Sequence, residues 1–154
     1  MRGLWERETI ALILLAAMLP LAVTWLLATG GSGLLRLTLV LVVVALWHGV
    51  FMLLRAQPPS FAGVLTALAI AILAPVDLGP VAMLLGISFG VVAGELAFGG
   101  WGRNVVSPAT LAVAFLGFGY SSATWPALPI QLGWSVAAVL AIGLFTGVMS
   151  WRIV

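Results

Sequence analysis

The sequence predicts an all-α polytopic membrane protein with about six transmembrane helices, two of them short. Of its 154 residues, 64% are hydrophobic and only 6% are charged, whereas a soluble domain usually carries about 25% charged residues. Several apolar runs approach or exceed the roughly 20 residues that are needed to cross a bilayer. Glycine clusters and prolines separate these runs. We therefore expect residues 1–154 to form a single transmembrane domain.

The composition also excludes several classes of function. The sequence has no cysteine, which rules out disulfides, thiolate metal sites and cysteine nucleophiles within the chain. It has no lysine either, which rules out a P-loop and a Schiff-base lysine. The net charge of +2 comes from arginines near predicted helix ends, without a basic patch that carries interleaved aromatic residues, so we expect no nucleic-acid partner. No set of residues predicts a metal site or a catalytic side chain.

The breaks in the apolar pattern divide the chain into six predicted helices. A glycine-rich turn at residues 30–33 follows the first helix, and prolines interrupt the pattern after the second and third helices. The third and fifth helices are too short for a full crossing. The predicted helices span residues 9–28, 34–54, 61–74, 80–98, 108–118 and 132–151.

The arginines predict the orientation in the membrane. Six crossings place both termini on one side, and a cytoplasmic N-terminus puts five of the six arginines inside, with only Arg36 outside. The first apolar run lacks a cleavage pattern, so we interpret it as a retained helix. We therefore expect a multi-pass protein of the bacterial cytoplasmic (inner) membrane with both termini in the cytoplasm.

Glycines recur at every fourth position of the helix predicted for residues 80–98. Gly86, Gly90 and Gly94 form one flat face, on which a second helix can pack closely. Gly143 and Gly147 repeat the spacing in the last helix. Because such pairs are common in membrane helices, we interpret them as packing surfaces without a functional assignment.

The turn between the fourth and fifth helices gathers the polar groups that the rest of the chain lacks. Irregular backbone near a bilayer must be buried in protein or line a cavity, and short helices beside such backbone resemble the broken helices around central binding sites. The alternative is a simple cytoplasmic turn that Arg103 anchors at the interface. The candidate binding residues are Gly99, Gly100, Trp101, Gly102, Asn104 and Ser107.

Three other polar residues stand out. Glu95 lies one turn before the end of its predicted helix, where it is either functional at membrane depth or the partner of Arg103. His48 is the single histidine, and it is either a packed or interfacial residue or half of a haem site that a partner chain completes. We expect Asp77 to be a solvated charge in an outside turn.

The residues around this turn resemble the NqrB/RnfD family, membrane subunits of the sodium-pumping NADH:quinone reductase and of the Rnf complex. Ser107 stands where the family usually has a second asparagine, and Glu95 stands where it usually has lysine. The resemblance covers residues 61–120 and implies one repeat of a longer fold, the N-terminal one, with one further helix. The matching residues are Leu85, Gly86, Phe89, Phe98, Gly99, Gly100, Gly102, Asn104, Pro108 and Ala109.

The resemblance implies a flavin, riboflavin or FMN, near Asn104 within the membrane domain. The family also carries a covalent FMN on a threonine in a Ser-x-Ala-Thr motif, and Ser121–Thr124 has that spelling. The usual acidic residue upstream of the motif is missing, because no acid occurs from Arg103 onward. We therefore expect the flavin to be bound without a covalent bond.

The first function hypothesis is therefore an integral membrane subunit of an electron-transport complex, at most an electron-transfer subunit of an oxidoreductase, with the flavin supplying the chemistry. The second is a flavin-free accessory or scaffold subunit, and the third is a small solute channel. The resemblance implies that this chain is one of two repeats that together form a pseudo-symmetric fold. Because one repeat alone is incomplete, we expect other membrane subunits or a homo-oligomer as partners, besides the lipid bilayer.

Overall fold

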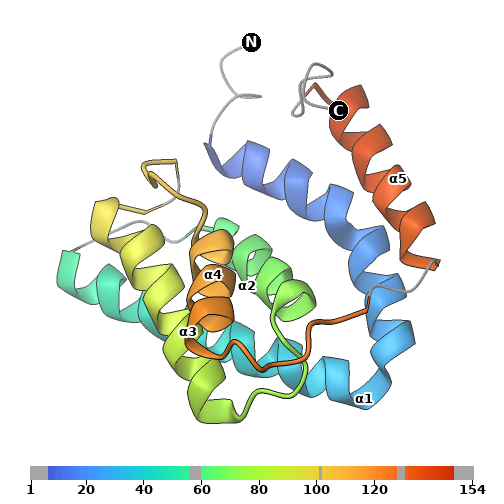
Figure 1. The fold of residues 1–154 in the computed structure, drawn as a ribbon. Helices are drawn as coiled ribbons and strands as arrows, with labels where there is room; N and C mark the ends of the chain where they lie inside the picture. Colours follow the sequence, from blue (N-terminus) through green and yellow to red (C-terminus); the bar gives the residue numbers. More distant parts are fainter. Residues whose placement is uncertain (1–6, 56–59, 101, 128–130, 148–154) are drawn as a thin grey trace.

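The computed structural model describes residues 7–55, 60–100, 102–127 and 131–147, and within them every regular element is a helix (Figure 1). This confirms the predicted all-α membrane fold. Two of its helices, Glu8–Arg55 and Pro80–Phe98, are long and apolar enough by length and composition to cross a membrane. The elements are α1 (Arg7–Arg55), α2 (Ala62–Leu73), α3 (Pro80–Gly94), the 3-10 helix η2 (Leu96–Phe98), α4 (Pro108–Gly119) and α5 (Gln131–Phe145).

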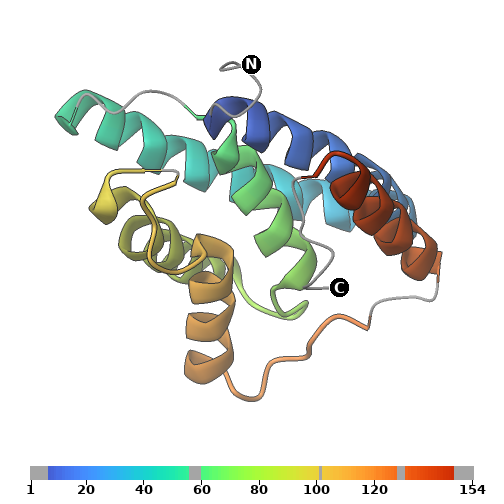
Figure 2. The same ribbon diagram turned by 90° about the horizontal axis from the view of Figure 1, so that it is seen from above.

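The first two predicted helices form one element with a sharp bend. Gly30 has φ 61° and ψ −139°, a conformation that glycine adopts easily because it has no Cβ. The two legs of α1 on either side of Gly30 run in different directions (Figures 1 and 2). The predicted loop at residues 30–33 is therefore a single-residue break, because the residues after Gly30 continue as helix.

The two short helices are confirmed, since α2 and α4 have 12 residues each. The long fourth helix is shorter than predicted: α3 ends at Gly94, and η2 takes the chain to Phe98. The last predicted helix extends to residue 151, but residues 148–154 lie outside the described part of the chain, where α5 ends at Phe145.

The glycine face of α3 packs against α4. A Cβ on Gly90 would lie 2.6 Å from the Pro108 carbonyl oxygen and 2.7 Å from the Ala112 nitrogen, and one on Gly94 would lie 2.9 Å from the Pro108 Cα. A Cβ on Gly86 would overlap the Leu116 side chain. The glycines are therefore what allows the two backbones to approach, as the spacing predicts.

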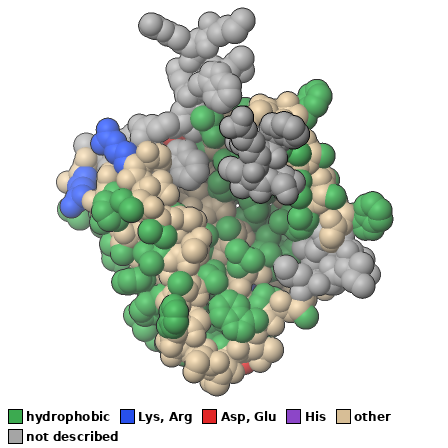
Figure 3. All heavy atoms as spheres, turned by 45° about the horizontal axis from the view of Figure 1, so that its top comes forward, with side chains coloured by type: hydrophobic (Ala, Val, Ile, Leu, Met, Phe, Trp, Pro, Cys, Tyr) green, Lys and Arg blue, Asp and Glu red, His purple; other side chains and the backbone are tan. Residues whose placement is uncertain are grey.

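Apolar side chains also cover much of the outer surface. Leu27 is 80% exposed and Phe118 is 91% exposed, and Figure 3 shows hydrophobic side chains spread over one face, with the basic side chains confined to one edge. Extended apolar surface of this kind indicates contact with lipid or with another protein.

The interconnecting segments gather at two opposite ends of the α3–α4 pair. At one end, which we call the turn end, Gly94 meets Pro108 and residues 95–107 connect the helices. At the other, the loop end, residues 74–79 meet residues 120–127, where Val76 N donates a 2.9 Å hydrogen bond to the Thr124 carbonyl oxygen. The candidate site lies at the turn end.

Candidate functional site

Left-handed glycines shape the turn that the sequence singles out. Gly99, Gly100 and Gly102 have φ values of 102°, 88° and 82°, which side chains with a Cβ rarely adopt. Gly100 N donates to the Glu95 carbonyl oxygen at 3.1 Å, and Arg103 N donates to the Gly100 carbonyl oxygen at the same distance. The glycines are thus required by the backbone path.

Among the described residues, the polar side chains of the turn have few partners. The half-buried Asn104 donates one long hydrogen bond, 3.4 Å, from Nδ2 to the Val106 carbonyl oxygen. Ser107 is exposed and precedes α4 without capping it. Trp101, the remaining predicted site residue, lies outside the described residues. The amide of Asn104 and the hydroxyl of Ser107 therefore keep most of their hydrogen-bonding capacity for a ligand.

Glu95, at the start of this turn, is fully buried and pairs with His48 of α1. Glu95 Oε1 lies 3.3 Å from His48 Nε2, and His48 Nδ1 lies 2.9 Å from the Val44 carbonyl oxygen. Gly63 of α2 leaves room for the imidazole, because a Cβ there would lie 3.2 Å from His48 Cε1. The partner of Glu95 is His48 rather than Arg103, which is exposed.

The imidazole of His48 has a partner at each ring nitrogen. A carbonyl oxygen only accepts hydrogen bonds, so His48 Nδ1 carries a hydrogen and donates it to the Val44 carbonyl oxygen. Nε2 faces Glu95 Oε1 on the other side of the ring. Both ring nitrogens are occupied, which leaves none for a haem iron and disfavours the haem half-site.

The second carboxylate oxygen, Glu95 Oε2, is buried and has no hydrogen-bond partner in the part of the chain that the structure describes. An unsatisfied buried acceptor costs about 1–3 kcal/mol. The Glu95 backbone is also the anchor of the turn, because its carbonyl oxygen accepts from both Phe98 N and Gly100 N. The buried carboxylate therefore ties the conformation of the glycine turn to α1.

A second carboxylate contact lies at the loop end. Thr124 donates to Asp77 from its backbone nitrogen at 2.8 Å and from Oγ1 at 2.9 Å. These hydrogen bonds, with the one from the backbone as the larger cause, lower the pKa of Asp77 below its ordinary value of 3.8. Asp77 is exposed, as expected, but it is held by Thr124. The contact places an acidic side chain beside Thr124, whose own segment contains none.

The comparisons with known proteins agree with this architecture. The sequence model of the NQR2, RnfD, RnfE family matches residues 5–143, and the chain belongs to this family. The chain is 33% identical over 112 residues to the NqrB subunit of the Na+-translocating NADH-quinone reductase of Stutzerimonas stutzeri, a match that covers 70% of the chain. It is 36% identical over 107 residues, 66% of the chain, to the corresponding NqrB protein of Neisseria meningitidis serogroup B.

The chain is short beside these relatives. The matched segments cover 27% of the Stutzerimonas protein and 25% of the Neisseria protein, so the chain spans about a quarter of the length of the curated relatives that it matches. The structure and the comparisons thus define an all-helical membrane protein whose sequence matches one segment of longer relatives.

The sequence did not predict the partner of either carboxylate, His48 for Glu95 or Thr124 for Asp77. His48 and Glu95 are 47 residues apart, and so are Asp77 and Thr124. The one signal available for the first pair was that the single histidine and the membrane-depth glutamate both occur in otherwise apolar helices, where buried charges are paired.

Proposed function

We propose that the chain is a membrane subunit of an electron-transport complex in the bacterial inner membrane, and that it binds a flavin without a covalent bond at residues 99–107. The observation that carries this proposal is the half-buried Asn104, whose amide makes one long hydrogen bond within the described residues, in a turn of left-handed glycines. The flavin, when bound, would supply the redox chemistry, and its partners would be other membrane subunits or further copies of the chain.

The residues of the turn fit the edge of a flavin ring. Such an edge presents both hydrogen-bond donors and acceptors, and the amide of Asn104 can donate and accept. Glycines allow the backbone to approach a flat ligand closely, and the half-exposed Phe98 can provide an apolar wall. The protein would bind and orient the ring, and the buried His48–Glu95 pair would hold the turn in place.

The Asp77–Thr124 contact favours a second candidate, a covalent FMN on Thr124. The motif Ser121–Thr124 resembles the attachment motif of the family, and Asp77 accepts a hydrogen bond from the threonine hydroxyl. The location of this contact in an exposed loop supports access for a modifying enzyme. A third candidate is the flavin-free accessory subunit, and the exposed apolar surface supports such a scaffold role.

Flavin retention by Asn104→Leu and Thr124→Val variants separates these candidates. Loss of one ligand hydrogen bond in a buried site costs about 1–3 kcal/mol, so we expect Asn104→Leu to weaken flavin retention roughly 5- to 150-fold. Thr124→Val should leave retention unchanged, and the denatured wild-type protein should show no fluorescent band on a gel.

Two other outcomes would each favour a different candidate. A fluorescent band that Thr124→Val abolishes would establish covalent attachment and contradict the site at the turn. Colourless wild-type protein, purified gently, would instead support the accessory subunit.

A further inference from the structure

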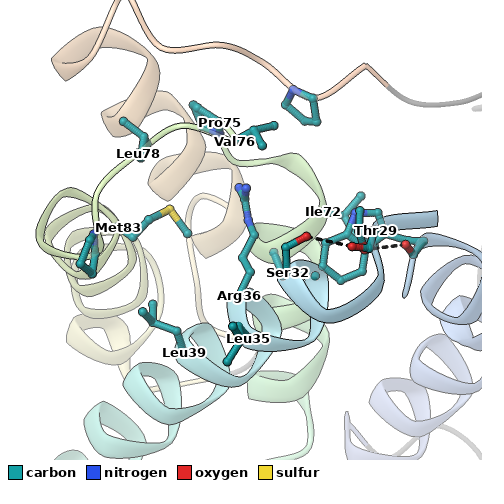
Figure 4. A pocket seen from close by; sticks show the side chains of 15 residues that line it. Thr29, Ser32, Leu35, Arg36, Leu39, Ile72, Pro75, Val76, Leu78 and Met83 are labelled. Atoms are coloured by element: carbon teal, nitrogen blue, oxygen red, sulfur yellow. Dashed lines mark hydrogen bonds between the residues drawn. The ribbon is translucent and has the colours of Figure 1, made fainter. Parts of the chain in front are cut away.

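A half-open cavity of about 300 Å³ lies at the loop end, away from the glycine turn. Both legs of α1 contribute to it on either side of the Gly30 bend, and the end of α2, the start of α3 and the two loops close it. Figure 4 shows Arg36 extending from α1 through this space toward the loop at Pro75 and Val76. Apart from Arg36, Thr29 and Ser32, the side chains that line the cavity are apolar.

Arg36 is the one charged residue among the described residues of the lining, and its hydrogen bonds there are incomplete. Nη2 donates a hydrogen bond to the Ala74 carbonyl oxygen, whereas the buried Nε has no partner among the residues that the structure describes. A guanidinium group carries five N–H donors and accepts nothing. An anionic acceptor in the cavity would satisfy the remaining donors.

Within the described part of the chain, no carboxylate neutralises Arg36. The three carboxylates there are all engaged elsewhere: Glu95 with His48, Asp77 with Thr124, and Glu8 with the backbone nitrogen of Phe61. Asp77, the acid of the adjoining loop, uses both of its oxygens on Thr124. A fixed counter-charge for Arg36 would therefore come from outside these residues.

The hydroxyl groups of the lining indicate what else the ligand carries. Thr29 Oγ1 donates to the Trp25 carbonyl oxygen at 2.7 Å, and Ser32 Oγ donates to the Thr29 carbonyl oxygen at 2.8 Å. Since each hydroxyl has only one hydrogen, both oxygens are left with acceptor capacity. They suit a ligand that has hydroxyl donors beside its anionic group.

From these contacts we propose that the Arg36 cavity binds the head group of an anionic phospholipid of the phosphatidylglycerol type. The phosphodiester pairs with the guanidinium of Arg36, and the glycerol hydroxyls donate to Thr29 and Ser32. The acyl chains lie along the exposed apolar surface beside the cavity, where Leu35 is 75% exposed and Val76 is 60% exposed. Arginine pairs with phosphate oxygens through charge-assisted hydrogen bonds.

Titration of the full-length protein in detergent with single lipids, followed by native mass spectrometry, tests this proposal. We expect phosphatidylglycerol to bind roughly 10- to 100-fold more tightly than zwitterionic phosphatidylcholine, because the choline cation of the latter repels the Arg36 guanidinium and offsets the attraction of the phosphodiester that both lipids share. Arg36→Gln should remove this preference, whereas Arg103→Gln, which removes the same charge from the exposed turn at the other end, should retain it. Equal binding of the two lipids to the wild-type protein would overturn the proposal.

Two further arms keep the test decisive. The double variant Thr29→Val and Ser32→Ala keeps Arg36, so it should still prefer phosphatidylglycerol over phosphatidylcholine. It should lose any preference over phosphatidic acid, which lacks the glycerol hydroxyls. If the double variant keeps the full preference over phosphatidic acid, the role of the hydroxyls is refuted.

Inorganic phosphate at millimolar concentration should not displace the lipid. If it does, the cavity is a site for free anions, and the lipid assignment is wrong.

Discussion

The two ends of the α3–α4 pair each hold a carboxylate against a partner 47 residues away, but in opposite surroundings. Glu95 at the turn end is fully buried against His48, whereas Asp77 at the loop end is exposed and accepts two hydrogen bonds from Thr124. A buried pair is costly to break, because the group that is left behind is shielded from water and has no partner. An exposed pair remains charged at little cost, so it can orient a loop without determining whether the protein folds.

The largest expected effect comes from separating the helices that connect the two ends. A Cβ at position 90 would lie within 2.7 Å of backbone atoms of Pro108 and Ala112, so the larger side chain of Gly90→Leu cannot fit between α3 and α4. We therefore expect loss of folded protein in detergent-stability assays. Gly49→Leu is the matched control, because a Cβ at Gly49 on α1 meets nothing within 4 Å. Wild-type stability of Gly90→Leu would show that α3 and α4 do not pack through this face.

The orientation of the two ends can be determined by labelling, since the chain has no cysteine of its own. The structure places Arg36 beside Ala74 at the loop end and Arg55 beside Ala97 at the turn end. Because arginines are more frequent on the cytoplasmic side and Arg36 is the one predicted outside, this placement agrees with a turn end that faces the cytoplasm. An impermeant thiol reagent applied from outside should label Gly31→Cys and not Ser60→Cys. The reverse labelling pattern would invert the proposed topology.

Breaking the buried pair at the turn end should have the next largest effect. Glu95→Ala leaves His48 without its partner and opens a void, which should lower the free energy of unfolding by about 3–5 kcal/mol. The double variant Glu95→Leu and His48→Leu should lose less than this, because no polar group is left unpaired. Equal or greater loss in the double variant would argue against the pairing.

The smallest expected effect is a pH dependence at the loop end. Because the pKa of Asp77 is lower in the folded protein than its ordinary value of 3.8, its contribution to stability is present above about pH 4 and is lost as the pH falls through the lowered pKa. Unfolding measured between about pH 3 and pH 6 should show this loss in the wild-type protein. Asp77→Asn should remove it, and an unchanged pH profile would show that Thr124 does not hold the carboxylate in solution.

Local signals predicted most of the fold. Pro80 and Pro108 start α3 and α4, as proline at a first helical turn should, and the glycines on α3 mark the face that packs. The bend at Gly30 was predicted as a turn over residues 30–33, because a glycine cluster does not reveal whether the helix resumes after one residue. The end of α3 at Gly94 was also missed, since the apolar pattern continues through η2.

The candidate site was predictable only in part. The glycine turn and Asn104 follow from residue types in one short segment. The His48–Glu95 and Asp77–Thr124 contacts join distant segments, and their formation depends on how α1, α2 and α3 pack, which periodicity does not specify. The cavity at Arg36 likewise exists only because the Gly30 bend brings the two legs of α1 beside the loop end.

The central claim, a flavin held without a covalent bond at the glycine turn, is tested most directly by the visible absorption spectrum of the gently purified protein. We expect a flavin spectrum in the wild-type protein that is lost on denaturation and filtration, and that is much weakened in Asn104→Leu. A protein without flavin absorption, or a flavin that stays attached to the denatured chain, would contradict this claim.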